Sequence, residues 1–319
     1  MDPSSRKQRS ARIHTLMWNL RIDSAIGEVV QALRASGIES LVLKGPTFAD
    51  WYPPDSPRTY VDGDVLVPPA LVAGAEDVLT SLGFAPTRDE RGVPDWWQEH
   101  ASSWLRSSDG GKIDLHRKLQ ATSAPPEAVW TSLWKRREAI TVGGASVWRL
   151  SEPGRALYAT LHATHHGSVD RRGLPHLQAA LQAVDDEGWT AALSLAIELN
   201  AVEAFATGLR LLPAGAELVS RIGVPDARSV KTSLLASTPP PVALGFDQLA
   251  GASGRQRAEI LLRKLLPPPG FIRYWWPPAA RSRRMLAVGY LYRPVWLAKH
   301  VPAGYRAWRA ARRDASNSS

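Results

Sequence analysis

The stretch RTYVDGDVLVPP, residues 58–69, places two carboxylates two residues apart in a pattern otherwise typical of a short apolar strand. Side chains at positions i and i+2 of a strand project from the same face, so Asp62 and Asp64 are expected about 7 Å apart at the backbone. Their like charges would repel, and a divalent cation with oxygen ligands would compensate them. The alternative interpretation is a turn at Gly63 with two solvated acids. Because residues 65–67 are apolar, the pattern is not that of a calcium-binding loop.

A third carboxylate lies in a second strand pattern. Asp114 stands in GKIDLHRKL, residues 111–119, with an apolar neighbour on each side. If the two strands are neighbours in a sheet, the three carboxylates can converge on one or two metal ions. His116 follows two residues later, and therefore on the same strand face, where it could orient the carboxylate, contact a substrate or simply pack.

Helix and strand patterns surround these residues. Apolar side chains at helical spacing over residues 22–36, with Gly37 after them, predict an amphipathic helix. The segment ESLVLKG, residues 39–45, predicts a buried strand, and PTFADWY after it begins with a proline suited to the first turn of a helix. We further expect a strand at 61–67, a helix at 70–82 and a hairpin within 102–119 with DGG at its turn.

Beyond residue 150 the apolar residues recur at three- and four-residue spacing and strand patterns nearly vanish, which predicts a helical half. Its segment HATHH carries His162, His165 and His166 at a spacing that can bind zinc. Because Ala163 follows His162, the His-Glu-x-x-His metalloprotease pattern is absent. We favour a packing or substrate-pocket role for these histidines over a zinc site.

The composition limits the classes of function. With 319 residues, 44% of them hydrophobic, the chain is long enough for two domains. It has no cysteine, which excludes disulfides and thiolate metal sites. Basic residues interrupt the first twenty positions, so neither a signal peptide nor a membrane-spanning helix is expected, and we predict a cytoplasmic protein.

The positive charge is concentrated at the C-terminus. Residues 270–319 contain ten Arg or Lys and one acid, a net charge of +9 that equals the formal charge of the whole chain. Tyr and Trp residues are interleaved with these charges, and such a segment can suit a membrane surface, RNA or an acidic partner. We favour instead the packing of this segment on its own domain through Arg stems and aromatic rings.

Taken in chain order, three segments resemble a family of uncharacterised nucleotidyltransferases within the nucleotidyltransferase-fold superfamily. They are LVLKGPTFADWYPPDSPRTYVDGDVLV, LTSLGF and HASSWLRSSDGGKIDLHRKL. In that family a Lys-Gly follows the first strand, an Arg precedes an Asp-x-Asp strand, and a later strand carries an acid followed by Leu-His. The matching positions are Lys44, Gly45, Arg58, Asp62, Asp64, Asp114 and His116. The resemblance is good over residues 20–120 and looser in the helical half.

The sequence departs from the family pattern at two places. The residue between the paired acids is usually bulky and apolar, whereas Gly63 here would loosen the strand and weaken the placement of Asp62. The superfamily's Gly-Ser turn is replaced by Lys44 and Gly45, as is common in this family, so the phosphate contact is less well defined than the metal site.

The resemblance implies an α+β fold, with a nucleotidyltransferase-like mixed sheet flanked by helices and followed by a mostly helical C-terminal half. Together with the composition it divides the chain into four parts. They are a basic N-terminal arm (1–20), a nucleotidyltransferase-like catalytic domain (21–150), a helical domain (151–266) and a basic, aromatic-rich C-terminal segment (267–319).

The resemblance also implies an enzyme that transfers a nucleoside monophosphate from an NTP, such as ATP, to an acceptor by two-metal-ion in-line displacement. Asp62, Asp64 and Asp114 would be the catalytic residues and the ligands of Mg²⁺ or Mn²⁺, and Asp114 could also receive the proton of the nucleophile. The nucleotide-binding set would be Lys44, Gly45, Thr47, Arg58 and His116.

Three classes of function stay open. The first is the metal-dependent transferase, and the second is a degenerate scaffold that binds a nucleotide or a partner without catalysis. The third is a basic nucleic-acid or membrane-surface adaptor, and its nucleic-acid binding would weaken steeply with salt. The acceptor of the transferase could be a small molecule, a protein or a peptide such as a natural-product precursor, the last by analogy alone, while nucleic acid is not favoured. The base of the NTP and the oligomeric state are not predicted.

Overall fold

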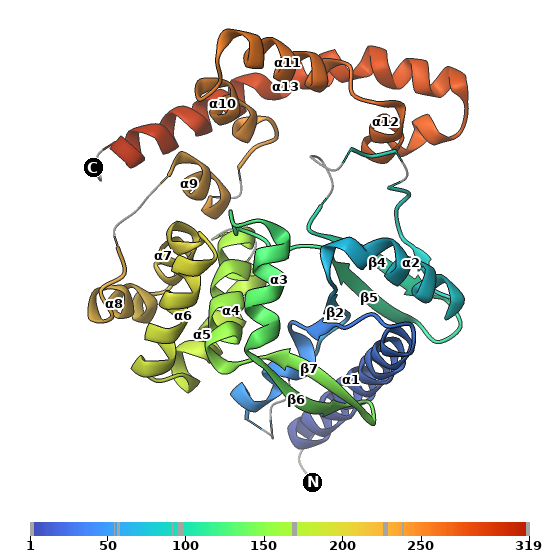
Figure 1. Ribbon diagram of the computed structural model, residues 1–319, viewed down its shortest axis with the longest axis vertical. Coiled ribbons are helices and arrows are strands. Elements are labelled where there is room, and N and C mark those ends of the chain that lie inside the picture. Colours follow the sequence, from blue (N-terminus) through green and yellow to red (C-terminus); the bar gives the residue numbers. More distant parts are fainter. Residues whose placement is uncertain are drawn as a thin grey trace.

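The computed structural model describes residues 3–53, 55, 58–90, 92–94, 99–167, 171–225, 229–237 and 239–316. Residues 1–2 and 317–319, at the ends of the expected N-terminal arm and C-terminal segment, lie outside this description. In the described part of the chain, seven strands form one mixed sheet with helices on both faces (Figure 1). The α+β class and the mostly helical C-terminal half are confirmed.

The sheet has the strand order β3-β4-β5-β2-β1-β7-β6. Its strands are β1 (Leu41–Val42), β2 (Gly63–Leu66), β3 (Ala85–Pro86), β4 (Ala101–Arg106), β5 (Gly111–His116), β6 (Arg137–Val142) and β7 (Ala145–Leu150). β2 is parallel to β5 and antiparallel to β1, while β1 is parallel to β7. The strand predicted at 61–67 and the hairpin predicted within 102–119 are confirmed as β2 and β4–β5.

Two layers of helices enclose the sheet. Ile26 of α1 and Val65 of β2 belong to one apolar cluster, which joins α1 and α2 to one face. Leu66 of β2 and Leu157 of α4 belong to a second cluster, which covers the other face with the helical half. The α-helices are α1 (Pro3–Ala35), α2 (Val72–Ser81), α3 (Pro126–Lys135), α4 (Glu152–His166), α5 (Leu174–Ala183), α6 (Asp186–Glu198), α7 (Val202–Leu209), α8 (Pro213–Arg221), α9 (Val230–Ala236), α10 (Ala243–Ala250), α11 (Gly254–Leu265), α12 (Pro269–Trp275) and α13 (Arg283–Ser316). The 3₁₀ helices are η1 (Gly45–Trp51), η2 (Pro69–Leu71), η3 (Arg171–Gly173) and η4 (Pro277–Ala280).

The helix predicted at 22–36 is the second half of α1. Its apolar positions Ile22, Ile26, Val29 and Leu33 are fully buried, as their spacing predicts. The helix begins much earlier, so the described part of the expected arm at 1–20 forms the first half of α1.

The segment after β1 differs from the prediction. PTFADWY lies in the 3₁₀ helix η1 rather than beginning an α-helix. In an α-helix the Thr47 carbonyl would accept a hydrogen bond from the backbone four residues later, but Arg155 of α4 donates to it at 2.8 Å. The strand expected at 39–45 is reduced to the two residues of β1, although Leu43 N still donates to Asp64 O at 3.0 Å.

The strand patterns noted above do not predict the hairpin β6–β7. Its turn consists of Gly143 and Gly144, whose φ angles are 56° and 78°. A two-residue type I′ turn requires positive φ at both central positions, which glycine adopts without strain. The hairpin matters for the site because β7 pairs with β1 and so places β1 inside the sheet.

Gly63 opens β2 directly beneath α1. A Cβ atom there would overlap Ile26 Cγ1 and lie 2.9 Å from Ile26 Cδ1 and 3.1 Å from Ile113 Cδ1. Gly63 therefore also has a packing role, which the sequence did not indicate. The missing side chain lets α1 approach the strand that carries Asp64, and Ile26 fills the space that a bulky residue would take.

We expect Gly63→Ala to lower the free energy of unfolding by about 1–3 kcal/mol, because the added methyl overpacks this contact. The double variant Gly63→Ala/Ile26→Ala should lose less than the sum of the two single losses, since the methyl enters space that Ile26 vacates. Gly254→Ala, with open space around it, is the control and should change stability by about 0.5 kcal/mol or less. Urea unfolding followed by circular dichroism measures all four variants, and strictly additive losses would contradict the packing explanation.

The C-terminal helices form a layer of their own. In Figure 1, α10 to α13 run across the top of the view, above the sheet and the helices α3 to α8. Arg293 of α13 is buried among the rings of Phe271, Trp275 and Trp296, with its guanidinium carbon 4.4–5.3 Å from their centroids. One face of the basic, aromatic segment thus packs against its own neighbouring helices. No helix in the described ranges is both long and apolar enough to cross a bilayer.

Candidate active site

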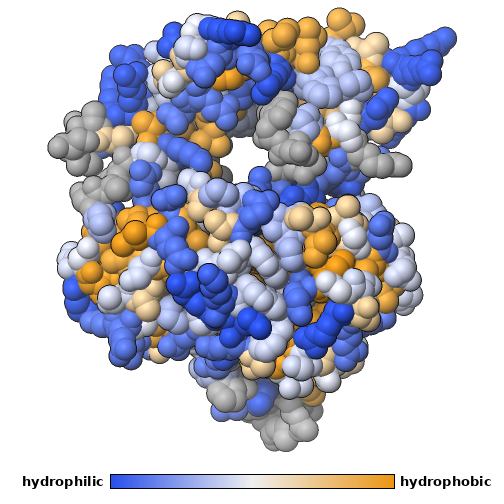
Figure 2. Space-filling view, viewed as in Figure 1, coloured by the Kyte–Doolittle hydropathy of each residue, from blue (hydrophilic) through white to orange (hydrophobic). Residues whose placement is uncertain are grey.

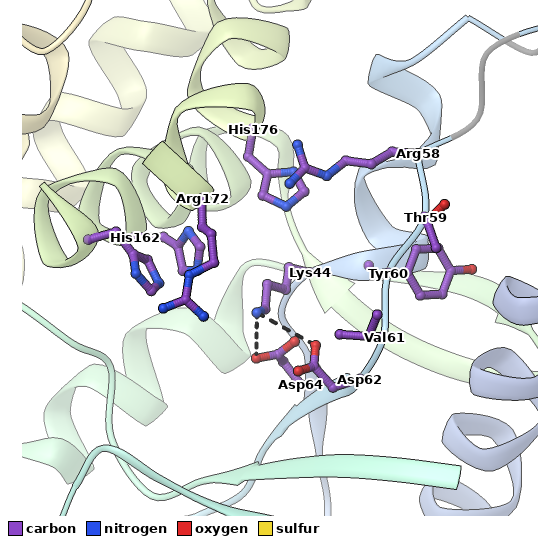
Figure 3. Close-up of a pocket in the computed structure, with 12 residues that line it drawn as sticks. Lys44, Arg58, Thr59, Tyr60, Val61, Asp62, Asp64, His162, Arg172 and His176 are labelled. Atoms are coloured by element: carbon purple, nitrogen blue, oxygen red, sulfur yellow. Dashed lines mark ion pairs between the residues drawn. The ribbon is translucent and has the colours of Figure 1, made fainter. Parts of the chain in front are cut away.

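Strands β2 and β5 bring the predicted acids together. Asp64 and Asp114 are register partners in this parallel pair, and Asp62 lies one residue before β2 begins. The sequence placed the three acids together only if these two strands were neighbours in the sheet. The β2–β5 pairing confirms that they are. Figure 3 shows Asp62 and Asp64 side by side, with the ammonium group of Lys44 facing both of them.

Asp64 is the most deeply buried of the three acids, with 2% of its surface exposed. Its Oδ1 accepts a hydrogen bond from His116 Nε2 at 2.9 Å and lies 3.3 Å from Lys44 Nζ. Burial alone raises the pKa of this carboxyl, but Lys44 and His116 outweigh the burial and lower the pKa to about 2. Asp64 Oδ2 is buried without any hydrogen-bond partner. Such an atom is rare in proteins and marks a place for a ligand.

Two lysines compensate the negative charge of Asp62. Lys44 Nζ lies 3.8 Å from Asp62 Oδ1, and Lys112 Nζ lies 3.0 Å from Asp62 Oδ2. Burial lowers the pKa of Lys44, but the charges of Asp64, Asp62 and Asp114 outweigh it, so the pKa is raised and the ammonium form is held. The three carboxylates and two ammonium groups leave one uncompensated negative charge at the site.

Asp114 has a different environment. Its Oδ1 accepts a hydrogen bond from Ser103 Oγ at 2.6 Å. Burial raises the pKa of Asp114, and the negative charges of Asp64 and Asp62 raise it further. Asp114 does not line the pocket described below, although it is the strand neighbour of Asp64, which does.

The acids have the chemical type and charge that a hard divalent cation requires, but their side chains are not arranged as a metal site. As the side chains stand, no three acidic or histidine residues in the described part of the chain are grouped closely enough to hold a metal ion. The ammonium group of Lys44 lies 3.8 Å from Asp62 and 3.3 Å from Asp64, where a cation could otherwise bind. The orphan Asp64 Oδ2 and the raised pKa of Asp114 are the two features that a bound cation would relieve.

The helical half supplies the opposite wall of the site. A pocket of about 190 Å³ is lined on one side by Lys44, Gly45, Asp62, Asp64 and the segment 58–61, and on the other by His162, His166, Arg172 and His176 (Figure 3). His162 is buried, and its Nδ1 has no hydrogen-bond partner. Burial lowers the pKa of His162 well below its usual value, and nearby Lys44, His166 and His176 lower it further. An anion bound in the pocket would interact favourably with the Arg and His side chains of this wall.

The predicted nucleotide-binding residues fall into two groups. Lys44, Gly45 and Arg58 line the pocket, and Asn19 of α1 fixes the backbone of Arg58 by donating to its carbonyl at 2.9 Å. His116 does not line it but contacts Asp64. Thr47 is fully buried outside the lining, and its hydroxyl donates to Leu43 O at 3.2 Å, which indicates a structural role in η1.

Sequence reasoning found the histidines of α4 but not the whole wall. His162 and His166 line the pocket, while His165 packs against His100 with ring centroids 5.0 Å apart. The positions of His162 and His166 support the substrate-pocket role predicted for HATHH, which stays a prediction. No sequence pattern identified Arg172 and His176 as site residues, because only the packing of η3 and α5 brings them close to the strands.

The buried histidines make stability sensitive to acid. Burial first, and the charges of Arg58 and Lys44 next, lower the pKa of His176 to about 3. Between that value and about 6.5 the unfolded chain binds the proton first, so we expect stability to fall as the pH drops from about 7 to 5. His176→Gln should be less stable at neutral pH but should lose less over this range. Thermal unfolding at both pH values tests this, and parallel losses in the two proteins would contradict it.

A family model described as an uncharacterised nucleotidyltransferase matches residues 3–214, about two thirds of the chain. The chain belongs to this family. The match spans the whole sheet and both walls of the pocket, and it confirms the resemblance carried by the Lys-Gly, Asp-x-Asp and Asp-Leu-His segments. It stops before α9 to α13, so the C-terminal layer lies outside the matched region.

Two solved structures are similar to part of this family member. The solution structure of the antibiotic-resistance factor ANT(2'')-Ia has a TM-score of 0.40 at 13% identity, over 57% of this chain and 94% of that chain. The crystal structure of an antigenic nucleotidyltransferase-like protein from Paracoccidioides brasiliensis has a TM-score of 0.32 at 13% identity, over 57% and 93%. No curated protein matches the chain in sequence. The family model alone therefore carries the assignment.

Proposed function

We propose that this nucleotidyltransferase-family protein is an enzyme that transfers a nucleoside monophosphate from an NTP to a hydroxyl group of an acceptor, with Mg²⁺ or Mn²⁺ bound by Asp62, Asp64 and Asp114. One observation carries the proposal: Asp62 and Asp64, with Asp114 beside them on the neighbouring strand, face a wall of Arg and His side chains across one pocket. Divalent ions bind such carboxylates and cationic side chains bind phosphate oxygens. The pocket therefore suits the metal complex of a polyphosphate.

The acids have separate tasks in this proposal. Asp62 and Asp64 would hold the cation on the nucleotide side, and Asp114 would hold a second one on the acceptor side. When bound, the cations would polarise the α-phosphate and neutralise charge on the departing pyrophosphate. His116 would orient Asp64, whose Oδ2 is the oxygen left without a partner.

Asp114 is also suited to accept a proton. Ser103 holds its Oδ1, and the raised pKa brings the carboxyl closer to a useful base than an ordinary exposed acid. In the proposed reaction the acceptor oxygen bonds to the α-phosphorus, and the bond from that phosphorus to the β-phosphate oxygen breaks. Pyrophosphate leaves with the bridging oxygen, and Asp114 Oδ2 takes the proton of the attacking hydroxyl.

The small size of the pocket indicates that different parts of the substrate bind in different pockets. A pocket of about 190 Å³ is smaller than the usual site for a nucleotide-sized ligand. A second pocket of about 450 Å³ adjoins it and shares Gly45, Arg58, Tyr60 and His176 with it. We assign the phosphates to the first pocket and the nucleoside or the acceptor to the second. A small molecule, a peptide end or a protein side chain would fit this arrangement.

The same geometry bears on the predicted domains. The pocket takes its carboxylates from residues 21–150 and its histidines from residues 151–266. We therefore propose that these two ranges act as one catalytic unit. The cytoplasmic location stays a prediction.

A second candidate is a nucleotide-binding module without transfer activity. It is favoured by the ion pairs of Lys44 with Asp62 and Asp64, which compensate much of the charge of the site without a metal. Such a module would bind a nucleotide with little dependence on a divalent ion.

Calorimetric titration with each of the four NTPs, with and without Mg²⁺, separates these candidates. We expect magnesium-dependent binding by the wild type and a loss of at least about tenfold in affinity in Asp62→Asn/Asp64→Asn. The control Asp77→Asn/Asp247→Asn removes two carboxylates outside the pocket and should bind like the wild type. Circular dichroism must show that every variant is folded. Equal binding with and without Mg²⁺ would favour the binding module over the transferase.

A further inference from the structure

Helix α11 turns its apolar side outward. None of its residues is buried, although Ala258, Leu261, Leu262 and Leu265 recur at the spacing of one helix face. Leu262 is 59% exposed, and Leu266 just beyond the helix is 64% exposed. An amphipathic helix in a globular protein normally buries this stripe. Here the stripe has no partner in the described part of the chain.

Helix α13 repeats the pattern on a larger scale. Its inner face buries Gly289, Arg293 and Gly304 against neighbouring helices. Its outer face carries the apolar residues Val288, Leu291, Val295, Ala298, Pro302 and Tyr305, all at three- or four-residue steps. Leu291 is 74% exposed and Val295 is 64% exposed. This outer stripe runs along about five helical turns.

The two stripes lie in one layer of the molecule. Arg293 of α13 donates to the carbonyl of Lys264 of α11 at 3.3 Å, so the helices are in contact. Figure 1 shows both at the top of the view, and Figure 2 shows apolar surface on the upper rim beside hydrophilic surface. We call the exposed stripes of α11 and α13 together the outer apolar face.

Positive charge surrounds this face almost without exception. Residues 254–316 contain fourteen Lys or Arg and two acids, a net charge of +12. One of the acids, Glu259, forms an ion pair with Arg263 of the same helix. On α13, Arg284 and Arg309 stand at the two ends of the stripe and Lys299 stands beside it, all three exposed. A partner must therefore be both apolar and anionic.

We propose that the outer apolar face of α11 and α13 binds the surface of a bilayer that contains anionic lipids, with both helices parallel to the surface. Leu and Val side chains would enter the boundary of the acyl chains, while the flanking Arg and Lys side chains reach the lipid phosphates. This position needs no membrane-spanning helix. It places the sheet and its pocket on the side away from the lipid, because the inner side of the layer faces them (Figure 1).

Charge decides against the two other partners that such a segment could have. A second copy of the chain would bring together two segments, each of net charge +12 over residues 254–316, with almost no acids to pair with them. Nucleic acid would match the charge but would leave the exposed Leu and Val side chains in water or against phosphates. Anionic lipid satisfies the charge and the apolar stripe at once.

Sedimentation with lipid vesicles tests the proposal on the full chain. We expect the wild type to bind vesicles of phosphatidylcholine with about 30% phosphatidylglycerol far better than pure phosphatidylcholine, and to be released as salt rises from about 0.1 to 0.5 M. Leu291→Glu/Val295→Glu should weaken binding to the anionic vesicles by at least about tenfold. The control, Leu105→Glu/Ile197→Glu, replaces two exposed apolar residues elsewhere, 42% and 55% exposed, and should bind like the wild type.

Three outcomes would overturn the proposal. One is a wild type that stays in the supernatant with anionic vesicles. Another is an equal loss in the two double variants, which would assign the binding to net charge alone. The third is a dimer, detected by light scattering, that is lost only in Leu291→Glu/Val295→Glu while vesicles are not bound. Both variants change exposed positions, and circular dichroism checks their folding.

Discussion

An Asp114→Asn variant is expected to be more stable than the wild type and yet to bind the proposed metal ion more weakly. Burial first, and the negative charges of Asp64 and Asp62 next, raise the pKa of Asp114, so its ionised form costs folding free energy at neutral pH. The amide removes that charge and can still accept the hydrogen bond from Ser103. We expect a gain of about 0.5–2 kcal/mol in the free energy of unfolding, of the size seen when strained functional sites are relaxed. The affinity for Mn²⁺ with an NTP should fall by at least about 10- to 100-fold.

Asp109→Asn is the matched control on the same hairpin. A hydrogen bond from Arg106 lowers the pKa of Asp109, so its ionised form stabilises the fold and the amide should not raise the melting temperature. Thermal unfolding without metal and calorimetry with Mn²⁺ and NTP measure both variants. An Asp114→Asn protein that melts below the wild type and binds Mn²⁺ normally would contradict the role given to Asp114.

The second large effect is expected at Lys44. Its ammonium group stands between Asp62 and Asp64 and competes with any cation for them. We expect Lys44→Met to bind Mn²⁺ alone more tightly than the wild type, because this competitor is gone. The same variant should bind the metal–NTP complex more weakly by about 1.5–3 kcal/mol, roughly 10- to 150-fold, since a charged hydrogen bond to phosphate is lost.

The control variant is Lys112→Met. It shows whether the opposite changes in the affinities for Mn²⁺ and for the metal–NTP complex are specific to Lys44 or follow from the loss of any positive charge. Lys112 also pairs with Asp62, but it does not line the pocket and cannot serve the phosphates in the same way. We expect it to raise the affinity for Mn²⁺ slightly and to leave the affinity for the metal–NTP complex unchanged. If Lys44→Met and Lys112→Met behave alike in calorimetry, then Lys44 is a structural counter-ion and not a phosphate ligand.

The strand half of the site could be predicted because its signals are local. The i, i+2 spacing of Asp62 and Asp64 places both on one face, and the apolar residues around Asp114 identify a second strand. The β2–β5 register then brings Asp64 opposite Asp114. The sequence also contains the Gly143–Gly144 turn signal of β6–β7, which strand spacing alone did not reveal.

The rest of the site depends on tertiary packing that no local pattern encodes. His176 meets Arg58 across more than one hundred residues of chain, because α5 packs against η1. Arg155 of α4 donates a hydrogen bond to the Thr47 carbonyl of η1, which is a 3₁₀ helix in place of the expected α-helix. The packing role of Gly63 depends on Ile26 of α1, which occupies the space that a side chain at position 63 would need. In each case the partner comes from a distant element.

Anomalous scattering from Mn²⁺, in crystals grown with Mn²⁺ and a non-hydrolysable NTP analogue, tests the proposed function most directly. We predict a manganese peak within bonding distance of the carboxylates of Asp62 and Asp64, Lys44 displaced toward the phosphates, and the phosphate chain against Arg58 and His176. A nucleotide bound in another pocket, or one bound beside these carboxylates with Lys44 still in place and no manganese, would contradict the metal-dependent transferase.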